Sequence, residues 1–230
     1  MLGVQGRGIR TFGEYVSKEN VKAFIQPIAI PYNLNENMQT GVIVPFVHKN
    51  PKNEAFDPRS GFGDISIFYK YEVLQKDRKA KTLRTLIKAR QKFPTGESER
   101  TPSLGADEYQ TQISAISGFI TTNYAFYAEA GYNTFFKNIE GHNINYNIAI
   151  GLPLLPQKYP PDQINVYLEV NGNYSIENGL HERFLSPAFQ YIPGKKLLLE
   201  TGVQLPIKDE KAKGKKTDFI FTLGGRFLIF

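Results

Sequence analysis

The sequence contains no cysteine, which excludes disulfide bonds, thiolate metal ligands and thiol nucleophiles. It also lacks tryptophan, although it has 13 tyrosines and 17 phenylalanines. No apolar run approaches the ~20 residues that a membrane-spanning helix needs. With 41% hydrophobic and 22% charged residues, the composition excludes a disordered chain and a helical membrane protein. A β-barrel escapes the test for long apolar runs, because its apolar residues alternate with polar ones.

A secretory signal is also missing from the start of the sequence. Met1-Leu2-Gly3 has no charged start, apolar stretch or small-residue cleavage site. This is the strongest sequence argument against export. If the protein is exported, we expect that its signal has been removed or its start wrongly assigned.

The formal charge of +6 comes largely from lysine-rich segments, notably 76–81 and 208–216. Aromatic residues do not interleave with these charges, as binding to single-stranded nucleic acid requires. We therefore interpret both segments as solvated connections and expect no nucleic-acid partner.

Alternation of apolar and polar residues is the main signal present. In 164–174, Ile164, Val166, Leu168 and Val170 form one face, whereas Asn165, Tyr167 and Glu169 belong to the other. This period of two indicates a β-strand. Similar segments lie at 65–73, 123–132, 144–150 and 197–205, with weaker candidates at 5–13, 21–32, 38–48, 81–92, 109–119, 182–192 and 217–230. Prolines 27, 31, 45 and 187 fall inside these candidates, and we expect them at strand ends or bulges.

The count of about 12 strands, with no convincing amphipathic helix, favours an all-β fold: a transmembrane, antiparallel, up-and-down β-barrel. We expect residues 1–230 to form a single outer-membrane barrel domain. Counted from the first predicted strand, the odd-numbered connections are mostly long and polar (14–20, 49–62, 94–108, 134–142, 176–181 and 207–216). The even-numbered connections are mostly short (33–37, 74–80, 121–123, 152–163 and 193–195). Long loops at one rim and short turns at the other are typical of such barrels.

With the apolar face toward lipid, the polar face lines the lumen. Burying these charges unpaired in a dry core would cost several kcal/mol each, whereas a wet lumen accommodates them. The predicted lumen-lining residues are Lys70, Glu72, Arg84, Lys88, Arg90, Tyr127, Glu129, Asn145, Asn147, Asn165, Tyr167, Glu169 and Glu200.

Two alternatives stay open at this point. The pattern alone also permits a soluble lipid-binding sandwich or lipocalin-like barrel with the apolar face inward, although lipocalins use only ~8 strands. The second alternative is a membrane barrel without an open pore, which acts as a surface or structural protein through its long loops.

Four motifs in order resemble one bacterial outer-membrane family. They are G-F-G-D-I-S-I-F-Y-K-Y (61–71), K-F-P-T-G-E (92–97), L-S-P-A-F-Q-Y (185–191) and L-G-G-R-F (223–227). The family is the transporter group named for the MetA pathway of phenol degradation. The resemblance implies an outer-membrane barrel, folded by the barrel-assembly machinery among outer-membrane lipids and lipopolysaccharide. It also implies transport of small solutes, with aromatic or hydrophobic compounds among the candidates.

Enzymatic sites are weakly supported. His181 with Ser175 or Ser186, oriented by Glu182, is a conceivable hydrolytic pair, but polar rim residues are the commoner interpretation. Asp57 and Asp64 could hold a cation, although a turn is favoured there. We expect no catalytic residue, no metal and no cofactor. The predicted function is passive diffusion of an unknown small solute, filtered by size and by the lumen charges.

Overall fold

The computed structural model describes residues 7–137, 141–156, 162–210 and 216–229. Its strands are β1 (Arg7–Lys18), β2 (Val21–Asn33), β3 (Met38–Pro51), β4 (Arg59–Phe62), β5 (Ser66–Arg78), β6 (Lys81–Lys92), β7 (Gln110–Thr121), β8 (Ala125–Phe135), β9 (Asn143–Pro153), β10 (Asp162–Ser175), β11 (His181–Pro193), β12 (Leu197–Asp209) and β13 (Thr217–Ile229). No helix among the described residues is long and apolar enough to cross a membrane.

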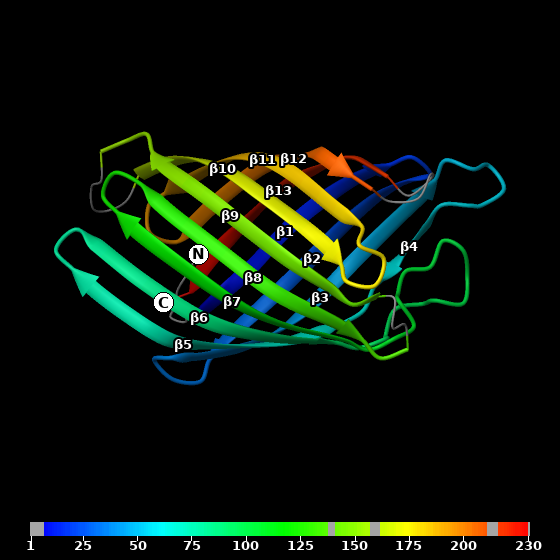
Figure 1. The fold of residues 1–230 in the computed structure, drawn as a ribbon, viewed down its shortest axis with the longest axis horizontal. Helices are drawn as coiled ribbons and strands as arrows, with labels where there is room; N and C mark the ends of the chain where they lie inside the picture. Colours follow the sequence, from blue (N-terminus) through cyan, green and yellow to red (C-terminus); the bar gives the residue numbers. More distant parts are fainter. Residues whose placement is uncertain (1–6, 138–140, 157–161, 211–215, 230) are drawn as a thin grey trace.

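Twelve strands close into a ring of antiparallel neighbours (Figure 1). The ring is sealed where β1 pairs with β13, in a register that runs from Arg7 opposite Ile229 to Lys18 opposite Thr217. The short β4 is an extra strand that pairs with the end of β3. The predicted antiparallel barrel of about 12 strands is therefore confirmed, and β4 lies inside the segment 49–62 that was expected to be a loop.

The two ends of the barrel carry different sets of connections, because successive strands run in opposite directions. The connections after β3 and β6 gather with β4 at one end of the barrel (Figure 1). The start of β1 and the end of β13 lie at the other end, with tight turns at 79–80 and 122–124. Parts of the predicted connections 134–142, 152–163 and 207–216 lie outside the described residues, as does Phe230.

Two predicted connections are largely strand. Residues 14–18 continue β1, where Tyr15 packs against Phe219 with ring centroids 6.0 Å apart. Residues 74–78 continue β5 and pair with β6 beyond a register shift between Glu72 and Leu74. Both predictions were wrong because polar and charged residues obscure the alternation in these segments without interrupting strand pairing. The true connections are the short segments 19–20 and 79–80.

The prolines lie within strands and not at their ends. Pro27 and Pro45 are opposite each other in the β2–β3 ladder. Pro27 falls where the pairing of β2 with β1 is interrupted, and Pro45 falls between the stretches of β3 that pair with β5 and with β4. Pro187 likewise occupies a gap between paired stretches of β11 and β12. Because proline lacks the N–H that a ladder uses, these gaps accommodate it without an unsatisfied partner.

The two faces of the wall have opposite chemistry. In β10, Leu168 and Val170 are exposed on the outside, whereas Tyr167 and Glu169 line an interior cavity. The same outward exposure of large apolar side chains recurs around the ring, for example at Ile28, Ile67, Ile113, Ile148 and Leu223. The soluble alternative requires the apolar face inward, so this arrangement contradicts it.

Candidate functional site

A cavity of about 900 Å³ occupies the interior of the barrel. Its lining begins at Gly8, near the start of β1, and reaches Leu104 in the connection after β6 at the opposite end. Every strand of the twelve-membered ring contributes lining residues. The cavity therefore follows the long direction of the barrel and is large enough to hold a small organic molecule.

Nine of the thirteen residues predicted from the sequence line this cavity. They are Lys70, Lys88, Arg90, Tyr127, Glu129, Asn147, Tyr167, Glu169 and Glu200.

The other four lie outside the lining and bond to neighbouring side chains. Glu72, whose side chain is almost fully buried, pairs with Arg84 at 3.8 Å. Asn165 donates to Gln190 Oε1 at 2.8 Å. Asn145 Oδ1 accepts hydrogen bonds from Gln112 and Asn133 at 3.1 and 3.0 Å.

Charge is segregated around the lumen. The arc from β13 through β1 to β6 carries what we call the basic wall: Arg10, Lys70, Lys88, Arg90, Lys92 and Arg226. The arc from β8 to β12 carries the acidic wall: Glu129, Glu169 and Glu200. Two acids on this arc are exceptions: Glu14 on β1, which interacts with Arg90, and Asp64, which precedes β5. Because low-dielectric walls focus field lines, this arrangement produces an electric field across the lumen.

Direct contacts join lumen side chains of nearby strands. Lys88 on β6 reaches over β7 to pair with Glu129 on β8 at 3.1 Å. On the acidic wall, Asn147 donates to Glu169 at 3.0 Å. Two tyrosines lie beside these acids, with the rings of Tyr127 and Tyr167 6.4 Å apart.

Gly151 makes room for one of these rings. A Cβ atom at position 151 would lie 2.4 Å from the Tyr167 ring, so only glycine lets the ring lie flat against the wall. The hydroxyl of Tyr167 donates to Gln190 Oε1 at 3.2 Å. The position of this aromatic ring is therefore fixed at both its face and its tip.

One sector of the lumen is apolar, which is unusual for a barrel interior. We call it the apolar strip, and it consists of inward-facing side chains of β2 and β3: Ile25, Pro27, Pro31, Ile43, Pro45 and Val47. Phe68 of β5 extends it, since a Cβ atom on Gly41 would lie 2.6 Å from the Phe68 ring. Sequence reasoning missed this strip because both faces of 21–32 are apolar, which left the inward face undefined.

The connection after β6 folds into the barrel mouth. Asp64, which is buried, accepts hydrogen bonds from the backbone of Gly96 at 3.0 Å and Ala106 at 2.8 Å. Leu104 at its centre is only 7% exposed and lines the cavity. We call residues 94–109 the inward loop. The carboxylate of Asp64 thus anchors this loop. This role replaces the cation site and the turn that were considered above for this segment.

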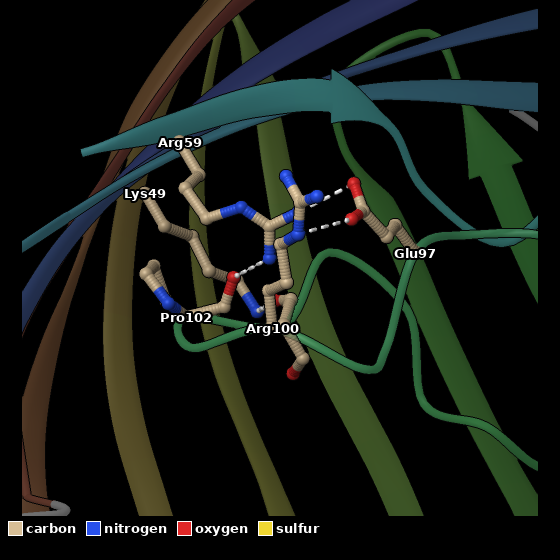
Figure 2. A network of polar contacts seen from close by, with 6 residues as sticks. Lys49, Arg59, Glu97, Arg100 and Pro102 are labelled. Atoms are coloured by element: carbon tan, nitrogen blue, oxygen red, sulfur yellow. Dashed lines mark hydrogen bonds and ion pairs between the residues drawn. The ribbon is translucent and has the colours of Figure 1, made fainter. Parts of the chain in front are cut away.

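Side chains from β3 and β4 hold the inward loop against the wall (Figure 2). Arg59 forms an ion pair with Glu97 and donates to the carbonyl of Pro102 at 3.0 Å. Lys49 donates to the carbonyl of Ser103. Arg100 approaches Glu97 at 3.5 Å from the solvent side, and its side chain is 77% exposed. The extra strand β4 therefore serves to place Arg59 at the loop.

Among the described residues, the histidines form no recognisable hydrolytic triad. His181 Nε2 shares a hydrogen bond with the hydroxyl of Tyr146 at 2.8 Å. Ser186 donates to Asn171, and the buried Ser175 Oγ has no hydrogen-bond partner among the described residues, so neither serine forms the pair considered above. His48 Nδ1 and Ser60 Oγ do lie 2.7 Å apart, a contact that sequence reasoning missed. Within the described parts of the chain, however, no carboxylate orients His48, as a triad requires.

Comparison with known proteins identifies the family. A family model described as "Putative MetA-pathway of phenol degradation" matches residues 18–223. The chain belongs to this family. The match confirms the resemblance drawn from the four motifs. A search among curated proteins found no significant match.

Solved structures similar to this MetA-pathway family member are outer-membrane barrels. An outer membrane channel from Pseudomonas putida F1 has a TM-score of 0.69 at 13% identity, covering 97% of this chain and 96% of the other. The KdgM porin, solved in complex with disordered oligogalacturonate, gives 0.60 at 6% identity with 97% and 99% coverage. The NanC porin gives 0.57 at 7% identity with 96% and 100% coverage. At these identities the likeness establishes the fold.

In this MetA-pathway barrel, two of the four motifs meet at the inward loop. The motif beginning at Gly61 supplies Asp64 and Ile65, and the motif beginning at Lys92 supplies Thr95 and Gly96. Besides the bond from Gly96 to Asp64, the backbone N–H of Ile65 donates to Thr95 Oγ1 at 2.9 Å. These motifs therefore hold the loop in the barrel mouth.

Proposed function

We propose that this chain is a passive channel for small solutes in the bacterial outer membrane. The observation that carries the proposal is the cavity, which extends from Gly8 at one end of the barrel to Leu104 near the other. Charged and polar side chains along most of its wall favour water inside it. Narrowing by the inward loop favours solutes of a few heavy atoms over oligomers.

The apolar outer surface supports placement in a membrane. Outer-membrane lipids and lipopolysaccharide would contact the exposed apolar band, and the barrel-assembly machinery would insert it. The family description adds aromatic compounds to the candidate solutes. We propose no catalytic role, because diffusion through a charged lumen requires none.

The proposed roles of the lumen residues follow from their positions. Lys70, Lys88 and Arg90 would attract anions on one side of the path, and Glu129, Glu169 and Glu200 would attract cations on the other. Tyr127 and Tyr167, whose rings contact each other, would narrow the path from the side of the acidic wall. Glu72 with Arg84, Asn145 and Asn165 would stiffen the wall beside the path.

Solute entry into lipid vesicles tests this function. Vesicles containing the refolded barrel should swell rapidly in a pentose, more slowly in a disaccharide and not measurably in a trisaccharide, because entry into a narrow pore depends steeply on solute size. Vesicles without protein provide the background rate. If the barrel is folded, as shown by a gel shift on boiling, and yet no solute enters, the alternative of a non-conducting surface barrel is correct.

A further inference from the structure

The apolar strip lies between two positive charges. Arg10 on β1 is opposite Ala29 of β2 in the ladder, so it borders the strip on one side. Lys70 on β5 is opposite Gln39 of β3 and borders it on the other side. Both side chains line the same cavity as the strip.

Neutral and aromatic groups are the direct contacts that the structure describes for these two cations. Lys70 donates to the neutral amide of Gln39 at 3.4 Å and lies 5.2 Å from the Phe68 ring centroid. The guanidinium of Arg10 lies 4.5 Å from the Phe12 ring centroid. Among the described residues, no carboxylate forms an ion pair with either side chain.

The surrounding charges leave this region positive. Lys70 is repelled by Arg10, Lys88 and Arg226 and attracted by Glu129. Glu129 is already paired with Lys88, while Glu200 is shared between Arg10 and Arg226. Arg10, Lys70, Lys88 and Arg226 thus face Glu129 and Glu200. The nearby acid Glu14, opposite Ile25 of the strip, interacts with Arg90. Such an excess inside low-dielectric walls favours an anion more strongly than it would in bulk water.

We propose that the lumen binds organic anions that combine an apolar body with a carboxylate. The apolar body lies on the strip, between Pro27 and Pro45, and the carboxylate lies between Arg10 and Lys70. A cavity of about 900 Å³ accommodates a single-ring aromatic acid together with water. This inference rests on the proposed channel function, since it names the solute class of the same lumen.

Binding in detergent solution tests the site without requiring transport. Calorimetry on the refolded barrel would compare benzoate with benzyl alcohol, which keeps the ring, and with acetate, which keeps the charge. Benzoate should bind at least about tenfold more tightly than either, because only it uses both the strip and the cations. Benzylamine, with the opposite charge, should not bind measurably. If benzoate binds no better than acetate or chloride, the cations attract any anion and the proposal is overturned.

Substitutions separate the two halves of the site. Lys70→Gln combined with Arg10→Gln should remove the preference for benzoate over benzyl alcohol. Ile43→Asn should weaken benzoate binding and leave acetate unchanged. Lys76→Gln, at an exposed position of the same strand, is the matched control and should bind benzoate like the wild type. Equal benzoate affinity in all these variants, with the gel shift retained, would contradict the site.

The site and the channel can fail separately. Benzoate binding by a barrel that admits no solute into vesicles would overturn the channel function and keep the site. Solute entry without any preference for benzoate would keep the channel and overturn the site.

Discussion

Replacing Arg59 with alanine is expected to raise single-channel conductance at least about twofold and to add rapid current fluctuations, because conductance depends on the narrowest part of the pore. The substitution removes the ion pair with Glu97 and the hydrogen bond to the carbonyl of Pro102. The Arg59 side chain is only 14% exposed, so water screens these contacts incompletely. Charge-assisted hydrogen bonds of this kind contribute roughly 1.5–3 kcal/mol each. Without them, Leu104 should leave the lumen for part of the time.

Arg100→Ala is the matched control for that variant. It removes the same type of side chain from the same cluster, but this arginine is 77% exposed and meets Glu97 in solvent. Exposed pairs contribute ~0–1 kcal/mol, so its conductance should equal that of the wild type. Lys49→Ala added to Arg59→Ala should increase the effect, because it removes the bond to Ser103. Wild-type conductance in the double variant would show that the inward loop does not limit the pore.

Ile148→Arg should destabilise the folded barrel by roughly 2–4 kcal/mol, the cost of placing arginine on the lipid face near the bilayer midplane. Ile148 lies in the middle of β9 and is 50% exposed on the outside. Unfolding of the refolded protein by denaturant in lipid vesicles would measure the loss. A smaller yield of heat-shifted barrel on gels should accompany it.

Asn147→Arg is the companion variant one residue away. Asn147 lines the cavity and donates to Glu169, so an arginine there would meet water and an acid in the lumen. Its stability should stay close to that of the wild type. If Asn147→Arg were the more destabilising of the two, the assignment of the inner and outer faces would be reversed.

Strand alternation predicted the barrel because the period of two survives wherever one face meets lipid and the other meets water. In 164–174 and 144–150 this contrast is strong, and the structure places Leu168 and Ile148 outside and Glu169 and Asn147 inside. The alternation weakens in 21–32, where the inward face is apolar as well. The apolar strip was therefore missed because its inward face is apolar, and that same property suggests a binding surface.

The inward loop could not be predicted from local pattern. Its placement depends on contacts between residues distant in sequence, such as Arg59 with Pro102 and Asp64 with Ala106. Sequence spacing does not reveal which loops fold back into a barrel. The charge segregation was also only partly visible, because Arg10, Lys92 and Arg226 of the basic wall were not among the predicted lumen residues.

The most direct test of the account is a recording of the wild-type barrel in a planar lipid bilayer. The charged lumen predicts discrete current steps of uniform size, with ion selectivity that weakens at high salt because the wall charges are screened. Barrels that shift on boiling, insert into the bilayer and carry no current would contradict a water-filled path from Gly8 to Leu104.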